Sequence, residues 1–256
     1  LGFAACPDGM VSYWTFDNDT VSGSTVQDIY GSNDGTNYGS TVGVEGVLGE
    51  AFDFDGANDY VSIGSSSLVS DGSAQVEFTI CEWMSTSEVI TQKGYVESNS
   101  ADQYPLTYIV LHDFDSDGYL ECRFDLRDDG KNLMGAQGTS HIADGKWHFY
   151  CGVRKTNPPF GEIYVDGQSE GTDASNNPTG TYSINDVRIG IHNHGGSIQE
   201  DFNGGIDEVA IFNRALNASE VAQLYNQSSQ GYDYCGTYKN TLPMSSKFTE
   251  FESTTN

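Results

Sequence analysis

The sequence predicts an all-β protein, built as a two-sheet antiparallel sandwich of the jelly-roll type with one short helix near the C-terminal end. Two patterns lead to this fold class. Short segments in which apolar and polar residues alternate recur along the 256 residues, and Gly, Asn, Ser and Asp separate them. Residues of these types form the tight turns that join antiparallel strands. Many short strands at this spacing are typical of a sandwich rather than of a parallel α/β sheet.

The first expected strand, residues 10–16, illustrates the alternation. Val11 and Tyr13 point to one side of it, and Trp14 and Phe16 point to the other. Aromatic residues make up 12% of the chain, enough to fill a core between two sheets. Further strands of this kind are expected at residues 50–56, 59–64, 76–84, 105–113, 118–126, 146–154, 161–167, 185–191 and 206–213.

One segment, residues 217–225, has the period of an amphipathic helix. Asn217 is expected to cap it, and Glu220 follows three residues later, as in a capping box. Val221 and Leu224 lie on its apolar stripe. Because this helix is short, we expect it to cover one end of the sandwich.

The charge balance limits the classes of partner. Eleven Lys and Arg against 37 Asp and Glu give a net charge of −26. A surface of this sign repels nucleic acid and anionic lipid headgroups, and it attracts cations such as Ca²⁺ that take several oxygen ligands. The sequence contains no run of about 18 apolar residues, so we expect no membrane insertion.

The five cysteines are Cys6, Cys81, Cys122, Cys151 and Cys235, and none of them forms a C-x-x-C motif. A zinc or thioredoxin-type function is therefore not indicated. The three central cysteines lie inside apolar strands, where a free thiol packs as a small hydrophobic group. A bond between Cys122 and Cys151 across strands stays open. The odd number leaves at least one thiol free or bonded to another chain.

Three Asn-X-Ser/Thr triplets, at Asn18, Asn217 and Asn226, are acceptor sequences for N-linked glycans in a competent host. The start of the sequence, LGFAACPDG, is typical of the end that remains after removal of a signal peptide. The acidity, the many turn-forming residues and the cysteines together favour an extracellular protein, secreted or displayed on the cell surface.

Seven sequence blocks carry a resemblance to a known family. Among them are GMVSYWTFDND (9–19), GVLGEAFDFDGANDYVSI (46–63) and the long closing block FNGGIDEVAIFNRALNASEVAQLY (202–225). In this order, over residues 9–226, they resemble the LamG-like jelly-roll domain of the concanavalin A-like lectin/glucanase superfamily. The resemblance implies a concanavalin A-like sandwich, and for many members it implies glycan binding and a calcium ion.

The resemblance also suggests how the chain is divided. Residues 1–8 form an N-terminal extension, and residues 9–230 form the jelly-roll domain. Residues 231–256 lie outside the family pattern and are expected to be a C-terminal tail, with a strand at residues 247–251. Such a strand pairs at the edge of a sheet or is exchanged between subunits.

Catalytic residues are missing from the closing block. Laminarinase-type members carry E-[ILV]-D-x-x-E on this strand, and a retaining hydrolase needs two carboxyl groups about 5–5.5 Å apart. Here Gly205 and Ala210 stand in place of the two Glu residues. Asp207 and Glu208 are adjacent in a strand, so we expect their side chains to point to opposite faces. We therefore expect a protein that is not an enzyme.

The resemblance implies a calcium site in which Asp28, Asn33 and Asp207 supply ligands together with backbone carbonyls. A loop rich in oxygen donors cannot pack a core, and a cation can hold it in place instead. The alternative is that Asp28 makes an Asx-turn and that Asp207 accepts hydrogen bonds from backbone amides at the start of a strand.

Two weaker metal patterns remain. Asp113, Asp115 and Asp117 have the spacing of the first ligands of an EF-hand loop, but no Glu stands at its twelfth position, so an acidic hairpin turn is favoured. His192 and His194 share one face of a strand and could begin a zinc site, but no third ligand is evident.

Glycan binding needs exposed aromatic rings against which sugar faces stack. Tyr30, Tyr38, Tyr95 and Tyr104 lie in polar, loop-like sequence and are the candidates. The three tryptophans fall within strands, where they are more typical of core or sheet-face residues.

The resemblance places Cys6 just before the first strand and Cys235 just after the last helix. Since the first and last strands are neighbours in this family, we expect a disulfide between these two residues. The predicted function is that of a non-catalytic, calcium-dependent adhesion module that binds glycans or other surface macromolecules. The alternative is a structural subunit that self-associates into an extracellular filament, sheath or surface layer.

Overall fold

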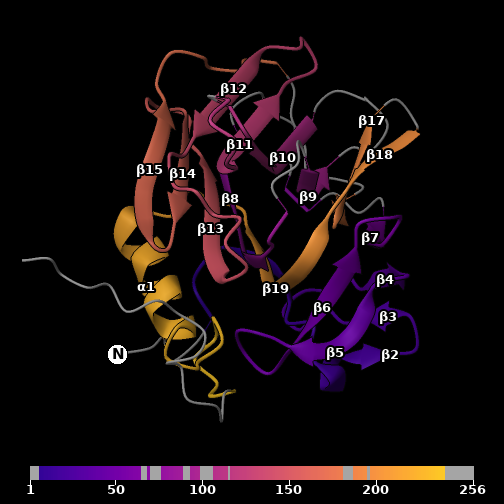
Figure 1. The fold of residues 1–256 in the computed structure, drawn as a ribbon. Coiled ribbons are helices and arrows are strands. Elements are labelled where there is room, and N and C mark those ends of the chain that lie inside the picture. Colours follow the sequence, from indigo (N-terminus) through magenta and orange to yellow (C-terminus); the bar gives the residue numbers. More distant parts are fainter. Residues whose placement is uncertain are drawn as a thin grey trace, which may run out of the picture.

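The fold was obtained as a computed structural model. It describes residues 6–64, 68–69, 76–88, 93–98, 106–114, 116–180, 187–194 and 197–239. Two large antiparallel sheets pack face to face, and one helix lies against the outside of one of them (Figure 1). The predicted all-β sandwich with a short C-terminal helix is confirmed.

The first sheet, called the eight-stranded sheet, lies next to the helix. Its central strand is the closing strand of the family pattern, β19, which pairs with β8, β6 and β1. The first strand of the sandwich, β1, is therefore paired with its last strand, β19. The strands are, in spatial order, β15 (Gln168–Asp173), β14 (Gly161–Val165), β13 (Trp147–Arg154), β8 (Phe78–Ser85), β19 (Asn203–Phe212), β6 (Glu50–Asp55) and β5 (Thr41–Glu45), with β1 (Met10–Trp14) on β19.

The second sheet, called the nine-stranded sheet, forms the other layer. A separate hairpin of β17 (Ile191–His194) and β18 (Ser197–Asp201) follows its strand β16. A 3-10 turn, η1 (Asn18–Thr20), precedes its first strand. The order is β12 (Leu133–Gln137), β11 (Glu121–Arg127), β10 (Leu106–His112), β9 (Lys93–Ser98), β16 (Val187–Ile189), β7 (Tyr60–Gly64), β4 (Gly35–Tyr38), β3 (Thr25–Val26) and β2 (Val21–Ser22).

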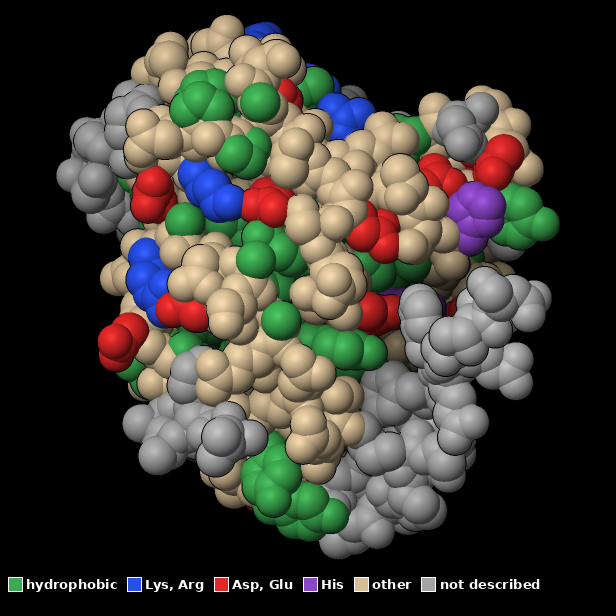
Figure 2. Space-filling view, turned by 90° about the vertical axis from the view of Figure 1, so that its left-hand side faces the viewer, with side chains coloured by type: hydrophobic (Ala, Val, Ile, Leu, Met, Phe, Trp, Pro, Cys, Tyr) green, Lys and Arg blue, Asp and Glu red, His purple; other side chains and the backbone are tan. Residues whose placement is uncertain are grey.

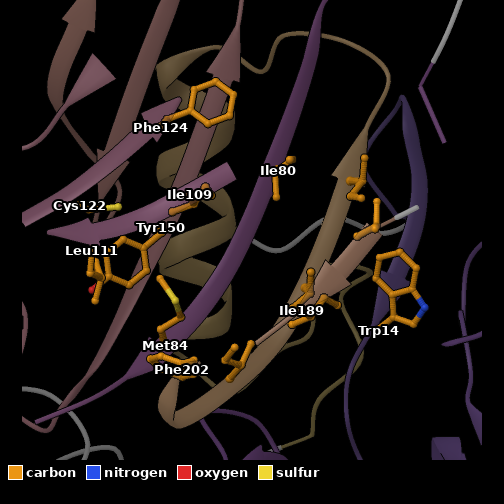
Figure 3. Packing of buried hydrophobic residues seen from close by; sticks show 14 of the residues in the cluster. Trp14, Ile80, Met84, Ile109, Leu111, Cys122, Phe124, Tyr150, Ile189 and Phe202 are labelled. Carbon is orange, nitrogen blue, oxygen red and sulfur yellow. The ribbon is translucent and has the colours of Figure 1, made fainter. Parts of the chain in front are cut away.

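The main core fills the space between the two sheets. Ile80 and Met84 of β8 belong to the same buried cluster as Ile109, Leu111 and Phe124 of the nine-stranded sheet (Figure 3). Each of these side chains is no more than 1% exposed. Alternate residues of these strands therefore face the main core.

A second apolar layer covers the outer face of the eight-stranded sheet. Trp83 and Phe149 point away from the main core and pack with Val221 and Leu224 of the helix α1 (Ala218–Ser228). The Trp83 Nε1–H also donates a hydrogen bond to Ser228 Oγ at 3.1 Å. The outer face of this sheet is therefore not open to solvent where the helix lies. Among the residues described above, no helix has the length and apolar character needed to cross a bilayer.

A β-bulge interrupts β19 at Glu208, whose φ is +54°. The pairing with β8 shifts register between Asp207 and Ala210. Because of the extra residue, Asp207 and Glu208 both enter the outer layer: Asp207 contacts the backbone of Val47, and Glu208 contacts Tyr13. The expectation that these two side chains point to opposite faces is therefore wrong.

The described part of the expected tail packs on the sandwich. Tyr234 is fully buried and stacks on Tyr13 of β1 with ring centroids 5.1 Å apart. Residues 240–256, with the strand expected at 247–251, lie outside the described residues.

The structure joins Cys6 to Cys235 and Cys81 to Cys151 in disulfides, and Cys122 is a buried free thiol. Cys81 and Cys151 are directly opposite each other on β8 and β13. Their interpretation as packed free thiols, and the open pairing of Cys122 with Cys151, are therefore wrong. The second disulfide is a bond between neighbouring strands.

Replacing Asn217 by alanine should lower the free energy of unfolding by about 1 kcal/mol. Asn217 Oδ1 accepts hydrogen bonds from the amides of Ser219 and Glu220, both at 3.0 Å, and the Glu220 carboxylate accepts one from the Asn217 amide. Urea unfolding measures the loss. Asn226→Ala, an exposed change later in the same helix, is the control. Equal losses in both variants would contradict a capping role.

Candidate functional site

A stack of three side chains stands on the outer face of the nine-stranded sheet. Tyr38 of β4 and Tyr60 of β7 are cross-strand partners, and their rings are stacked with centroids 4.6 Å apart and planes 14° from parallel. The Arg188 guanidinium of β16 lies over the Tyr60 ring, 5.4 Å from its centroid. Tyr38 is 48% exposed, so one aromatic face is presented to solvent. We call these three residues the aromatic platform.

The local sequence explains why the platform faces outward. Tyr60 precedes Val61 and Ile63 in β7, and Arg188 lies between Val187 and Ile189 in β16. These four aliphatic residues belong to the main core. Their neighbours in sequence must therefore point to the other face. The aromatic rings and the guanidinium hold one another in place, because cross-strand aromatic pairs and cation–π contacts are both favourable.

A polar group continues this face on β10 and β11. Tyr108 and Asp125 are cross-strand partners and share a side-chain hydrogen bond, and Arg123 Nε donates to Asp125 Oδ1 at 2.6 Å. Burial raises the pKa of Asp125, and the charge and hydrogen bond of Arg123 oppose this rise. Burial also raises the pKa of the Tyr108 hydroxyl, with a further rise from the Asp125 charge. These groups offer donors and acceptors on the same sheet face as the platform.

The four candidate tyrosines have different surroundings. Tyr38 belongs to the platform, and Tyr30 is 45% exposed beside the Asp28 loop. Tyr95 lies in β9, but its side chain is outside the described part, as is the whole of Tyr104. Sequence reasoning missed Tyr60 and Arg188, although an aromatic residue on the polar face of a strand was a readable signal.

Asp28 and Asn33 come together, while Asp207 has other partners. Asp28 Oδ1 accepts the amides of Tyr13, Tyr30 and Gly31 at 2.9, 3.1 and 2.8 Å, and Oδ2 accepts the Asn33 amide at 3.1 Å. No hydrogen bond within the described residues joins Asp207 to Asp28 or Asn33. The Asp28 carboxylate acts as the centre of a tight loop.

Asp207 and Glu208 are fully buried beneath the outer layer. Asp207 Oδ2 accepts the amides of Val47 and Leu48 at 2.8 and 3.2 Å, and Glu208 Oε2 contacts the Tyr13 hydroxyl. Burial raises the pKa of both carboxyl groups well above their ordinary values. Both groups are therefore closed off from a substrate in solution.

The acidic hairpin between β10 and β11 gathers a different set of ligands from the expected one. Asp113 accepts the backbone amides of Asp117 and Gly118, both at 3.0 Å, as in a tight turn. Asp115 lies outside the described residues. Asp117 approaches Glu121 and His141, and their ligand atoms all lie within 4.8 Å of one another. The sequence showed no signal for His141, because the loop before β13 brings it there.

The remaining candidates are placed as follows. The side chains of His192 and His194 lie outside the described part, although their backbone forms β17. Asn18, Asn217 and Asn226 are all exposed. Exposure is what an acceptor asparagine requires, and glycosylation at these residues stays a prediction.

Among the described residues, five basic side chains form ion pairs with carboxylates: Arg123, Lys146, Lys155, Arg214 and Lys239. Lys155 contacts Glu162, and Arg214 Nη2 lies 2.8 Å from Glu220 Oε1. Figure 2 shows several Lys and Arg side chains beside Asp and Glu side chains on the side that carries β15 and α1. These ion pairs neutralise only a few carboxylates. The remaining Asp and Glu side chains account for the net charge of −26.

The sequence profile of the concanavalin A-like lectin/glucanases superfamily matches residues 55–222. The chain belongs to this superfamily. The match spans strands of both sheets and the start of α1, so the concanavalin A-like fold that the seven blocks implied is confirmed. No curated protein matches the sequence at a significant level.

Solved structures share the concanavalin A-like fold at low sequence identity. Domain 4 of AbnA, an extracellular arabinanase from Geobacillus stearothermophilus solved with arabinotriose, has a TM-score of 0.61 and 18% identity, covering 84% of this chain and 98% of that one. The binding domain of Paraclostridial Mosquitocidal Protein 1 has a TM-score of 0.65 and 15% identity, covering 90% and 55%. Trypanosoma rangeli sialidase in complex with sialic acid has a TM-score of 0.57 and 16% identity, covering 86% and 33%. The chain thus spans about half of the toxin structure and a third of the sialidase.

Proposed function

We propose that the protein is a non-catalytic, extracellular module that binds glycans through the outer face of the nine-stranded sheet and acts in adhesion. The observation that carries this proposal is the aromatic platform of Tyr38, Tyr60 and Arg188, in which Tyr38 is 48% exposed. Sugars present apolar C–H faces and a rim of hydroxyl groups. An exposed, rigidly held aromatic ring matches the first, and neighbouring charged side chains match the second.

The platform is organised before any ligand binds. Tyr60 supports the back of the Tyr38 ring, and Arg188 covers the other side of Tyr60. Less side-chain freedom is then lost on binding, so that more of the contact energy contributes to affinity. Arabinotriose bound to a domain of the same fold makes a neutral oligosaccharide a reasonable probe, and the sialidase complex suggests an acidic one.

A non-catalytic role is supported by the closing strand. The motif positions of the two catalytic carboxylates hold Gly205 and Ala210, and the adjacent Asp207 and Glu208 are fully buried. A Cβ added at Gly205 would come within 2.6 Å of the Trp147 ring, so this position has no room for a glutamate side chain. A retaining glycoside hydrolase of the laminarinase type needs two carboxyl groups that reach the substrate, and at these positions the strand offers none.

Tyr38→Ala should weaken glycan binding by about tenfold, since an aromatic contact of about 1–1.5 kcal/mol corresponds to that factor. Binding is measured on an array that includes arabino-oligosaccharides and sialylated oligosaccharides, and the affinity for the best ligand is then measured by calorimetry. Tyr238→Ala is the matched control, because Tyr238 is 58% exposed on the C-terminal segment. The same ligands should be recovered uncleaved.

Two results would reject the proposal. One is that the parent protein retains no glycan on the array. The other is that Tyr38→Ala and Tyr238→Ala bind the ligand equally well. Loss of binding in Arg188→Met as well would support the platform as a unit, because Arg188 contacts Tyr60 rather than Tyr38.

Calcium dependence is a separate part of this proposal. Asp28, Asn33 and Asp207 do not fit as three ligands of one ion, because Asp28 already accepts four backbone amides and Asp207 contacts Val47 and Leu48 instead. Amide N–H groups repel a cation. These contacts do not support the calcium site, which rests on the resemblance alone; repeating the glycan assay with CaCl₂ and with a chelator tests it.

An extracellular location is supported by the two disulfides, which persist in oxidising compartments. The alternative role, a self-associating subunit of a filament, sheath or surface layer, depends on residues 240–256, which the structure does not describe. It therefore stays a prediction. Sedimentation of the full chain, and of a chain that ends at residue 239, measures whether that segment drives assembly.

A further inference from the structure

Three metal-binding side chains meet at the tip of the β10–β11 hairpin. His141 Nε2 lies 3.1 Å from Asp117 Oδ2 and 3.8 Å from Glu121 Oε1. All three ligand atoms lie within 4.8 Å of one another. Two ligands of a tetrahedral zinc ion, each at a bond length of about 2.1 Å, stand about 3.4 Å apart. The two separations from His141 Nε2 are therefore close to those of ligands around one ion.

A simple ion pair does not account for this arrangement. The Nε2 atom of His141 carries at most one hydrogen, and it faces carboxylate oxygens from both Asp117 and Glu121. The distance of 3.8 Å to Glu121 is too long for a hydrogen bond. A cation between the three atoms can contact all of them at once, whereas one hydrogen cannot.

The two carboxylates are held in place by the hairpin itself. Asp113 accepts the amide of Asp117 and so fixes the turn that carries it. Glu121 Oε2 accepts the amide of Phe114 at 3.1 Å, which turns Oε1 toward His141. Ligands held in this way lose little freedom when an ion binds.

The imidazole is oriented by its neighbours. The His141 ring lies parallel to the Tyr119 ring, with centroids 4.4 Å apart and planes 8° from parallel. The next residue, Ile142, donates its amide to the carbonyl of Leu120 at 3.2 Å, which attaches this loop to the hairpin. The ring plane and the backbone position are therefore both fixed from outside the ligand set.

The site has a buried base and an open rim. The Glu121 side chain is 4% exposed, while Asp117 and His141 are 38% and 48% exposed. A metal ion held by these three residues would keep a coordination position toward solvent. Three protein ligands and one open position form an arrangement in which water or an oxygen atom of a ligand completes the shell.

We propose that Asp117, Glu121 and His141 form a binding site for a borderline divalent metal ion of the Zn²⁺ class. An imidazole nitrogen with two carboxylates suits Zn²⁺ and related ions, whereas Ca²⁺ prefers oxygen ligands alone. This site differs from the calcium loop expected at Asp113, Asp115 and Asp117, because Asp113 serves the turn. It does not depend on glycan binding at the aromatic platform, which lies on other strands.

Calorimetry on the full chain, freed of metal and kept in excess CaCl₂, tests the proposal. Calcium occupies the non-specific cation sites of the acidic surface, so the heat measured on adding zinc reports only sites that prefer zinc to calcium. ZnCl₂ should bind with one ion per chain. His141→Gln and Glu121→Gln should each weaken this binding by at least about tenfold.

Matched histidine variants locate the site. His148→Gln should bind zinc normally, because both ring nitrogens of His148 already pair with carboxylates, Nδ1 with Asp166 at 2.8 Å and Nε2 with Asp144 at 3.2 Å. The double change of His192 and His194 to Gln should also leave the affinity unchanged. Nitrogen NMR of the five histidines should show a zinc-dependent shift at His141.

Three results would overturn the proposal: no zinc binding in excess calcium, unchanged affinity in His141→Gln, or loss of affinity in the His192 and His194 double variant. The exposed position of His141 makes a folding defect easy to recognise, since the metal-free variant should unfold at the same temperature as the metal-free parent. The NMR shift of the parent protein decides the question even where a variant fails to fold.

Discussion

Cys6→Ser should lower the free energy of unfolding by about 2–5 kcal/mol. The Cys6–Cys235 disulfide joins residues 229 positions apart in sequence, so it closes a loop of almost the whole domain. In the chain-entropy model a disulfide that closes a loop of this size stabilises the folded state by about 5 kcal/mol, and measured values are often smaller. The bond also fixes the segment that carries the fully buried Tyr234 onto Tyr13.

Denaturant unfolding of Cys6→Ser, Cys235→Ser and the double variant measures this effect. Because either single change breaks the same bond, the double variant should be no less stable than the singles. A double variant whose loss equals the sum of both single losses would mean that the two side chains stabilise the fold through separate contacts. Peptide mapping without reductant should recover Cys6 bonded to Cys235 in the parent.

Local patterns in the sequence predicted local structure well. The capping box of α1 was readable because Asn217 and Glu220 satisfy each other's backbone within one turn. The strands were readable because the alternation between core and solvent faces is a property of each strand alone. The bulge at Glu208 was not, since a positive φ at a residue other than glycine is set by the packing around it.

The sites show the same division. Tyr38 could be named as an exposed aromatic residue, but its support by Tyr60 and Arg188 depends on β4, β7 and β16 being neighbours. The Cys81–Cys151 bond likewise depends on the register of β8 with β13. His141 could not be linked to Asp117 from the sequence, because the contact forms across two different loops. Pairings between distant segments need the three-dimensional fold.

Glu82→Met should stabilise the protein by about 2–4 kcal/mol at pH 7.5 and by less near pH 5, where the Glu82 carboxyl is uncharged in the folded protein. Glu82 is fully buried on β8. It alternates with Ile80 and Met84, which belong to the main core, so its side chain points to the same face of the sheet. Neither of its carboxylate oxygens has a hydrogen-bond partner among the described residues. Burial raises the pKa of Glu82 from its ordinary value of 4.5 to about 8.

The sign of the pH effect follows from this rise in pKa. Between about pH 4.5 and pH 8 the unfolded chain has lost the Glu82 proton and the folded chain has kept it. Folding then requires proton uptake, so stability is highest below the unfolded pKa and falls as the pH rises, by about 1.4 kcal/mol per pH unit for one group. The raised pKa values of Asp207 and Glu208 act in the same direction.

Other carboxyl groups set the acid limit. Hydrogen bonds from Asn132 and from backbone amides outweigh the effect of burial and lower the pKa of Asp128, and the Arg214 hydrogen bond lowers the pKa of Glu220. Groups with a lowered pKa stabilise the fold above their unfolded pKa, and this contribution is lost as the pH falls through the folded value. We therefore expect the parent protein to be most stable in mildly acidic solution.

Urea unfolding of the parent, Glu82→Met and Glu82→Gln from pH 5 to pH 8.5 separates charge from polarity. Both variants should show a flatter fall of stability with pH, because neither can lose a proton at residue 82. Glu82→Met should gain more, since a buried amide without a partner still loses its hydrogen bonds to water. Parallel pH curves for the parent and Glu82→Met would mean that Glu82 titrates alike in both states, and so that water or a cation reaches its carboxylate inside the sandwich.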